Sequence, residues 1–250
     1  MEKPPIKIRE VESVEELQGC VDLQRAVFAT SDLENSPVRH LIVTKCAGGF
    51  TLGAFDGDKM VGFVLSVPMF RGEERAFYSH MTAVDKKYQN YGIGAQLKWA
   101  QRERALAERI KYIKWTFQPV QARNAFFNLE RLGVTIKIYQ PNFYGTDYST
   151  SAEQDKASGL DSDRLFAEWF LDAPKVSALA KGEEFVETGE VVCRIEIPNN
   201  WNELVVADTP KAIAEQERIK GEFQTAFAEN LIVRGFERSQ TNPRYLLFQE

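Results

Sequence analysis

The fold of this chain is decided by the stretch Met81–Leu97, which reads MTAVDKKYQNYGIGAQL. Its first residues are typical of a β-strand, its middle is a polar loop that contains Gly92 and Gly94, and its last residues begin a helix. The first backbone N–H groups of a helix have no partner inside it, and the helix dipole adds partial positive charge there. A glycine-bearing loop in front of such an end therefore predicts a cradle for a phosphate group.

Two other phosphate-binding loops are excluded by their own requirements. The dinucleotide fingerprint needs a third glycine, and this chain has Leu97 at that position. The nucleoside-triphosphate loop needs Gly-Lys followed by Ser or Thr, which the sequence does not contain. What remains is the pattern Gln89-x-x-Gly92-x-Gly94, directly after a strand that ends at Val84.

This pattern resembles the Gln/Arg-x-x-Gly-x-Gly/Ala motif of the GNAT family of acyl-CoA-dependent N-acyltransferases, which binds the coenzyme A pyrophosphate through backbone amides. Two positions depart mildly from the family, because Lys86 and Asn90 stand where proline and glycine are usual. The resemblance implies acetyl-CoA as cosubstrate, bound by Ala83, Val84, Gln89, Asn90, Tyr91, Gly92, Ile93, Gly94 and Ala95. The alternative is a plain strand-to-helix turn whose glycines serve only its tightness.

A second resemblance lies in residues 125–134, AFFNLERLGV, at the end of a helix expected over residues 121–132. It is similar to the GNAT helix that flanks the pantetheine arm of the coenzyme. We expect Asn124 and Asn128, four residues apart on one helix face, to supply polar contacts to the coenzyme. The family often has a tyrosine, the acid for the leaving thiolate, where this chain has Leu129, so the usual general acid is absent.

In GNAT enzymes the amine attacks the thioester directly, so a base for the ammonium proton is needed rather than a protein nucleophile. We expect His80 to be that base, because it lies four residues before Val84, where some GNAT enzymes acting on aryl-alkyl amines also have a histidine. Period-two alternation predicts that Tyr78, His80 and Thr82 share one face of the strand. The alternative is a histidine hydrogen-bonded within a packed sheet. Weaker candidates for the base are Glu74, Asp32 and Glu34.

The acid that protonates the leaving thiolate is expected to be Tyr144, with Tyr139 as a second candidate. Tyr144 belongs to an aromatic loop, Pro141–Gly145, and Tyr139 ends an expected strand. Packing is the alternative role for both, since tyrosines in loops and at strand ends commonly pack.

Composition excludes several classes of partner. The 250 residues carry 31 Lys and Arg against 36 Asp and Glu, and the basic residues are spread along the chain, so nucleic acid is not expected. Without a leader pattern or an apolar run of membrane-spanning length, the sequence predicts a cytoplasmic protein with no membrane partner. Cys20, Cys46 and Cys193 lack the spacing of a metal site or disulfide framework and are expected to be buried thiols. With only two histidines, zinc is not expected.

The expected fold is a mixed α/β GNAT fold, with a mostly antiparallel central sheet flanked by helices. We assign residues 1–150 to the GNAT domain and residues 151–250 to a smaller C-terminal α+β extension packed on it, with a polar linker at residues 146–159. Strands are expected at residues 6–10, 49–55, 60–69, 76–84, 112–118, 134–139, 191–197, 231–236 and 245–248. Helices are expected at residues 13–29, after the cradle from Ile93, at 121–132, at 161–170 and from Thr209.

The sequence thus predicts acetyl-CoA-dependent transfer of an acyl group to an amine. Its acceptor is expected to be a small-molecule amine, because bulky residues of the extension such as Trp169 and Phe170 would narrow the acceptor side. The chain offers two candidate acceptor-binding walls: the carboxylates of Asp32 and Glu34 in one loop, and the rings of Phe143, Tyr144 and Tyr148 in another. The alternative is a coenzyme A-binding sensor or scaffold without turnover, which the leucine at position 129 favours.

Overall fold

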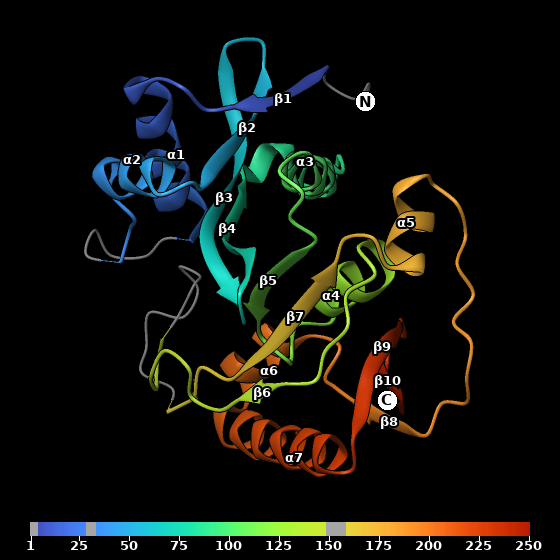
Figure 1. Cartoon of the computed structure of the whole chain (residues 1–250). Helices are drawn as coiled ribbons and strands as arrows, with labels where there is room; N and C mark the ends of the chain where they lie inside the picture. The colour runs from blue at the N-terminus through green and yellow to red at the C-terminus, as the bar shows by residue number, and fades with distance from the viewer. Residues whose placement is uncertain (1–4, 29–33, 149–158) are drawn as a thin grey trace. The chain divides into compact units, whose positions relative to one another are not determined.

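The computed structural model of the chain describes residues 5–28, 34–148 and 159–250. The chain divides into two compact units, with Ile113 in the first and Lys114 in the second at the division. In Figure 1 the first unit runs from blue to green and the second from green to red. None of the helices in the described ranges combines the length and the apolar character that a membrane span requires. The expected domain boundary near residue 150 stays a prediction.

An antiparallel sheet forms the centre of the first unit. Its strands, in spatial order, are β1 (Ile6–Glu10), β2 (Phe50–Asp56), β3 (Lys59–Arg71) and β4 (Glu74–Val84). Two-residue turns join β2 to β3 and β3 to β4, and each turn begins with a glycine at positive φ. Such dihedrals favour glycine, so the local sequence sets both hairpins. These four strands and their antiparallel pairing confirm the expected fold class.

Two helices cover one face of this sheet (Figure 1). In α1 (Val14–Phe28) the hydroxyl of Ser13 accepts a hydrogen bond from the Glu16 amide at 3.2 Å, which is the helix cap that the sequence Ser13-x-x-Glu16 favours. The second helix, α2 (Val38–Cys46), was not expected from the sequence. Both helices pack on one hydrophobic core with β3 and β4. Of the three thiols, only Cys20 is fully buried, and Cys46 is exposed, contrary to expectation.

The third helix, α3 (Ile93–Ala107), begins at the cradle and lies on the other side of the strands (Figure 1). Arg104 interrupts its apolar stripe, and the contacts of this side chain explain why it is tolerated. The guanidinium pairs with Glu10 at 3.5 Å and with Glu108, and it lies over the ring of Phe50 at 5.2 Å from the centroid. An ionic and aromatic environment thus replaces an apolar one at this point of the helix.

A β-bulge interrupts the pairing of β3 with β4. Leu65 of β3 pairs with Met81 of β4, and the next residue, Ser66, pairs with Ser79. His80 is therefore the extra residue of the bulge, with no partner in the β3 register.

The bulge overturns the predicted alternation along β4. Tyr78 pairs with Val67 and Thr82 pairs with Val64, and those two β3 residues are three apart. Residues an odd number apart in a strand face opposite sides, so Tyr78 and Thr82 do not share a face. The one inserted residue shifts the alternation of side chains along the strand, and no local sequence pattern predicts a bulge at this position.

The second unit is an α+β arrangement that includes a small separate sheet. β5 (Tyr112–Phe117) enters it across the division. Its other elements are α4 (Ala122–Phe126), η2 (Phe127–Arg131), β6 (Tyr139–Gln140), β7 (Arg164–Phe170), α5 (Pro174–Ala180), β8 (Cys193–Glu196), α6 (Trp201–Ala207), α7 (Thr209–Ala228), β9 (Leu231–Glu237) and β10 (Arg244–Gln249). The antiparallel sheet β8-β10-β9 confirms the expected closing strands and supplies the extra C-terminal sheet.

Three expectations for this unit are corrected. Residues 164–170 form the strand β7 rather than a helix, because Leu165, Ala167 and Trp169 are buried in strict alternation. The expected strand at 134–139 is reduced to two isolated bridges and the short β6. The expected helix at 121–132 changes after Phe126 into a π-helical turn, in which the Leu132 amide donates to the Phe127 carbonyl at 3.1 Å.

Candidate active site

The cradle lies between the end of β4 and the first turn of α3. Gly92 begins the helix in the left-handed region, with φ of +78°, and no side chain caps this end in the described structure. The Gln96 amide makes the first helical hydrogen bond, to the Gly92 carbonyl at 3.1 Å. The amides of Ile93, Gly94 and Ala95 precede that bond and point out of the helix end, where an anion would receive them.

The glycines of the cradle face open space. A Cβ at Gly92 or at Gly94 would have no heavy atom within 4 Å. By contrast, a Cβ at Gly62 would stand 2.9 Å from the Ala83 carbonyl oxygen, so packing explains that glycine. Gly92 is explained by its dihedral, but Gly94 has neither a positive φ nor a close neighbour. The fold does not require a glycine at 94, and a small residue there leaves room for the close approach of a ligand.

The loop in front of the helix is held by its own side chains. A short 3₁₀ turn, η1 (Lys86–Tyr88), follows the strand, and the Asp85 carboxylate caps it at 2.9 Å. The Gln89 amide nitrogen donates to the Val84 carbonyl at 3.2 Å, which ties the loop to the strand end. Asn90 takes a left-handed φ of +71°, the conformation that its residue type tolerates best after glycine. Of the other expected contact residues, Ala83 and Ile93 are buried, and Tyr91 and Ala95 are half-buried.

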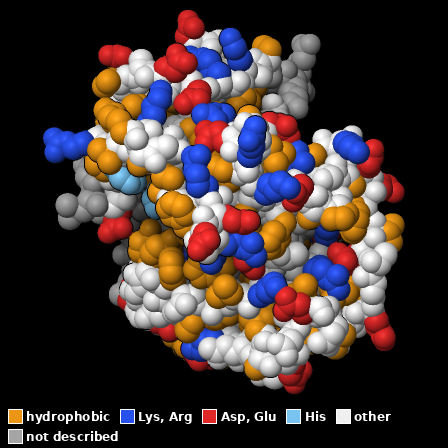
Figure 2. Space-filling model, viewed as in Figure 1, with side chains coloured by type: hydrophobic (Ala, Val, Ile, Leu, Met, Phe, Trp, Pro, Cys, Tyr) orange, Lys and Arg blue, Asp and Glu red, His pale blue; other side chains and the backbone are white. Residues whose placement is uncertain are grey.

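The bulge in β4 carries His80 to the surface, beside the other histidine of the chain. The ring of His40, on α2, lies edge-on to it with a centroid distance of 6.3 Å. The pale blue histidine atoms are visible on the surface in Figure 2. Although the His80 side chain is exposed, the surrounding protein lowers its pKa below 6.5, first by desolvation and then through the charge of His40. At neutral pH the imidazole is therefore unprotonated and can accept a proton.

Tyr144 lies in a loop of the second unit with exposed aromatic rings. The side chains of Phe143 and Tyr144 are 39% and 41% exposed, and their rings meet edge-on at 4.6 Å. Tyr148 stacks on Tyr144 at 4.6 Å, and the Arg164 guanidinium lies 5.1 Å from the Tyr144 ring centroid. An open aromatic surface confirms neither the acid role of Tyr144 nor the packing alternative, so the role stays a prediction.

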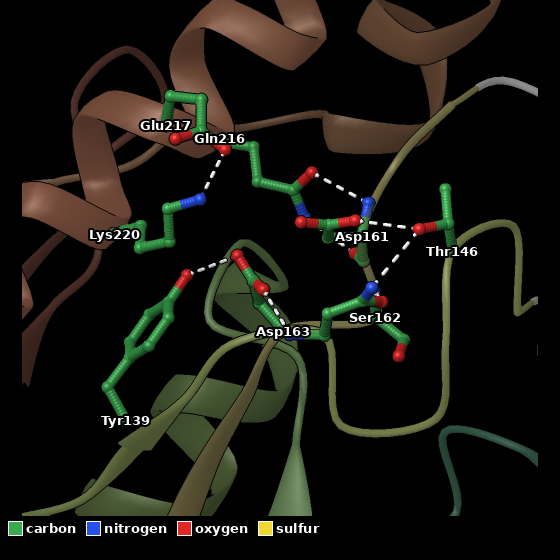
Figure 3. Close-up of polar contacts among 9 residues, drawn as sticks. Tyr139, Thr146, Asp161, Ser162, Asp163, Gln216, Glu217 and Lys220 are labelled. Atoms are coloured by element: carbon green, nitrogen blue, oxygen red, sulfur yellow. Dashed lines mark hydrogen bonds and ion pairs between the residues drawn. The ribbon is translucent and has the colours of Figure 1, made fainter.

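Tyr139 is held in a polar network that makes it a poor acid (Figure 3). Its hydroxyl donates to Asp163 at 2.5 Å, and the other oxygen of that carboxylate accepts from the Asn142 amide at 2.8 Å. Burial and then the hydrogen bond to Asp163 raise the pKa of Tyr139. Close to Asp163, the Gln216 side chain of α7 makes two hydrogen bonds to the backbone of Asp161. It accepts from the Asp161 amide at 3.1 Å and donates to the Asp161 carbonyl at 2.7 Å. This proton belongs to a structural hydrogen bond that fixes the aromatic loop.

The two asparagines expected to contact the coenzyme have different environments. Asn124 is exposed, whereas Asn128 is buried and its side-chain oxygen accepts from the Trp115 indole at 3.3 Å. Leu129, at the position of the family's tyrosine, is fully buried. Asn128 thus has a partner within its own unit, and the coenzyme contacts of both asparagines stay predictions.

The weaker candidates gain no support from the structure. Glu74 pairs with Arg71 at the tip of an exposed hairpin, and Glu34 is exposed. Asp32 lies outside the described residues. Trp169, expected to narrow the acceptor side, is fully buried, and its indole donates to the Leu132 carbonyl at 2.7 Å. It belongs to the core of the second unit and does not line an open site.

Two residues beside the site escaped the sequence analysis. His40 lies on a helix that was not predicted, and its only signal was that the chain has two histidines. Lys98 on α3 is 3% exposed. Its residue type is typical of an exposed helix face, so no sequence pattern indicated that it is buried.

Comparison with known proteins shows what this chain is similar to. Residues 17–133 match the family model described as the acetyltransferase (GNAT) family. The ribosomal-protein-S18-alanine N-acetyltransferase of Escherichia coli is similar in structure, with a TM-score of 0.51 and 15% identity over 66% of this chain and 92% of its own. A GNAT-family structure from Desulfovibrio desulfuricans is also similar, with a TM-score of 0.53 and 14% identity over 66% of this chain and 99% of its own. A chain of the NatC complex bound to Gag peptide and coenzyme A has a TM-score of 0.51 and 15% identity over 66% of this chain and 98% of its own. No curated protein matches the chain.

Proposed function

Residues 17–133 make this chain a GNAT-family acyltransferase that uses acetyl-CoA, and from that premise we propose that it acetylates a small-molecule amine with His80 as general base. The family and the cosubstrate follow from the matched domain. The acceptor and the catalytic residues are the proposal, and the following observations support them.

The cradle would hold the coenzyme by its pyrophosphate. The amides of Ile93, Gly94 and Ala95 are free of side-chain caps in the described structure, and the space before Gly92 and Gly94 is open. The single observation that carries the assignment is this open helix end, where a Cβ at Gly92 or at Gly94 would meet no heavy atom within 4 Å. A bulky side chain there would fill the space through which the phosphate must approach the backbone.

His80 would take the proton that the amine loses. An alkyl amine with a pKa near that of lysine, about 10.4, is mostly protonated and unreactive at neutral pH. His80 is exposed, and its lowered pKa keeps it in the form that accepts a proton. Holding the amine in line with the thioester would lower the activation barrier further, since orientation accounts for roughly 7–11 kcal/mol of a barrier in favourable cases. The bond from the amine nitrogen to the acyl carbon forms as the bond to the coenzyme sulfur breaks.

A small acceptor is supported by the aromatic loop rather than by Trp169. Phe143 and Tyr144 expose their rings on a loop that hydrogen bonds fix, and rings of this kind bind flat or cationic small molecules. The fold by itself does not choose the acceptor, because the E. coli structure above is an alanine N-acetyltransferase of a ribosomal protein. Peptide amines are therefore the comparison that any acceptor screen must include.

The second candidate function is a protein that binds coenzyme A without turnover. The fully buried Leu129 favours it, because no hydroxyl is available at the position where the family often has its acid. Thiol release from acetyl-CoA, measured across small amines and peptides, separates the two functions. We expect release that depends on a small amine. Tight acetyl-CoA binding with no release from any acceptor would identify the binding protein.

A further inference from the structure

A buried polar network joins α3 to the two strands at the bulge. The Lys98 ammonium nitrogen lies 3.0 Å from the Ser79 hydroxyl and 2.7 Å from the side-chain oxygen of Gln101. The Gln101 amide donates to Ser66 at 2.7 Å and to Ser79 at 3.1 Å. All four side chains are buried, at 5% exposure or less. Three elements, β3, β4 and α3, thus meet through one cluster of polar side chains.

The network lies at the point where the strand pairing is interrupted. Ser66 and Ser79 are paired with each other, and His80 is the extra residue that follows. A bulge has weaker pairing than a regular ladder, so its geometry depends on what anchors the neighbouring residues. Here both members of the last regular pair are anchored from α3, while His80 itself emerges beside His40.

The same helix presents the cradle at its N-terminal end. Gly94 and Ala95 lie in the first turn of α3, and Lys98 follows about one turn later. A helix is stiff over this distance, so the network fixes the bulge relative to the backbone amides that would hold the pyrophosphate. The expected base and the expected coenzyme site are thereby connected through one rigid element.

Packing alone does not explain a lysine at this position. A methionine or leucine would fill similar volume without the penalty of desolvating an amine. Burial lowers the pKa of Lys98 well below its usual value, which favours the neutral amine. A neutral amine still has two protons, which it can donate to Gln101 and to the Ser79 hydroxyl, while Gln101 also donates to Ser79, so the three groups close a ring of hydrogen bonds.

We propose that Lys98 is a positioning residue, which locks the β4 bulge to α3 and thereby sets His80 for proton transfer at the coenzyme thioester. The inference rests on the proposed role of His80. It assigns Lys98 no contact with the substrate. Lys98 acts through Ser79, on the α3 side of the strand, while the group that faces His80 from α2 is His40.

The test compares Lys98→Met, which keeps the aliphatic stem, with Ser79→Ala, a smaller change that removes the hydroxyl. Lys7→Met, at an exposed position of β1, is the matched control. We expect both network variants to lower kcat roughly 10- to 100-fold with acetyl-CoA affinity unchanged, as for a misplaced catalytic group. The double variant should lose no more than the worse single one, because both changes break the same contact.

The histidine signals in NMR give a readout that does not need turnover. The chain has two histidines, so His40→Gln identifies the His80 signal by elimination. In folded Lys98→Met and Ser79→Ala, the His80 titration should move toward 6.5, because a loosened bulge admits water, while Lys7→Met leaves it in place.

Folded variants with an unchanged His80 titration and unchanged kcat would overturn the inference. If Lys98→Met does not fold, Ser79→Ala decides by the same criteria. If the His80 titration shifts in the two network variants but the wild-type protein turns over no amine, the mechanical link is retained and the proposed function is rejected instead.

Discussion

At the scale of the residue, the chemistry depends on how the protein treats its two histidines. His80 leaves the strand register and reaches the surface, where His40 from a separate helix lies 6.3 Å away, ring centroid to ring centroid. A positive charge on His80 is disfavoured by desolvation and by its neighbour His40, so the pKa of His80 is lowered and the neutral base is favoured.

Replacing His80 with glutamine should lower turnover roughly 100-fold at neutral pH, within the range of general base catalysis. Acetyl-CoA affinity should be unchanged, and activity should partly recover at high pH, where the amine loses its proton unaided. Steady-state kinetics over a pH series measures both. Wild-type turnover of this variant at every pH would make His80 a structural residue.

Replacing His40 with glutamine should raise the pKa of His80. The acid limb of the pH–rate profile lies where His80 becomes protonated, and removing the second cause of its low pKa moves that limb to higher pH. The variant should therefore lose activity relative to wild type below pH 6.5 and match it at pH 8. A limb that stays in place would show that His40 does not act on the base.

At the scale of the element, α3 combines two tasks that its sequence separates by one turn. Its first turn presents amides to open space, and its next turn anchors the strands through Lys98 and Gln101. The first task needs small residues, and the second needs long polar side chains.

Gly94→Leu separates the ligand role of this small residue from its role in the fold. Leucine is close to alanine in helix propensity, and alanine favours a helix by about 0.5–1 kcal/mol over glycine, so the variant should be at least as stable as wild type in denaturant unfolding. Its acetyl-CoA affinity should fall by ~10-fold or more, measured by calorimetry, because the bulky side chain fills the space before the helix amides. Gly221→Leu is the matched control, since Gly221 also lies in a helix with no atom within 4 Å of a Cβ, and it should leave the affinity unchanged. Unchanged affinity in Gly94→Leu would remove the pyrophosphate assignment.

At the scale of the whole molecule, buried amines link stability to pH. Lys98 and Lys175 both have pKa values lowered first by burial. Unfolding returns each to about 10.5, so the unfolded chain binds more protons in the window between the folded and unfolded values. Stability therefore rises with pH in that window and is lowest once the folded amine must be protonated.

Thermal unfolding between pH 7 and 9 tests this link. We expect the wild-type Tm to rise with pH and the rise to be smaller in Lys98→Met, whereas Lys7→Met keeps the wild-type slope. Above pH 10, Tyr139 and Tyr245 oppose this rise of stability with pH. Their pKa values are raised in the folded protein, so the unfolded chain loses these protons first and stability falls as the pH increases. Equal slopes in all three proteins would mean that Lys98 is charged in the fold.

The sequence by itself determined what short-range chemistry controls. The cradle, both glycine hairpins, the cap of α1 and the closing strands were predictable, because each depends on dihedrals or side-chain periods within a few residues. For the candidate site, short-range chemistry located Gly92 and Gly94 at the start of α3, and the role of His80 stays a prediction.

Only the tertiary structure decided the rest. The bulge at His80 arises from the register of β3 against β4, and the burial of Lys98 arises from the packing of α3 on both. Residues 164–170 suit a helix or a strand by composition, and buried alternation with distant partners made them β7. In each case the deciding partner is remote in the chain, so its energy enters only once the elements meet, and no local pattern carries it.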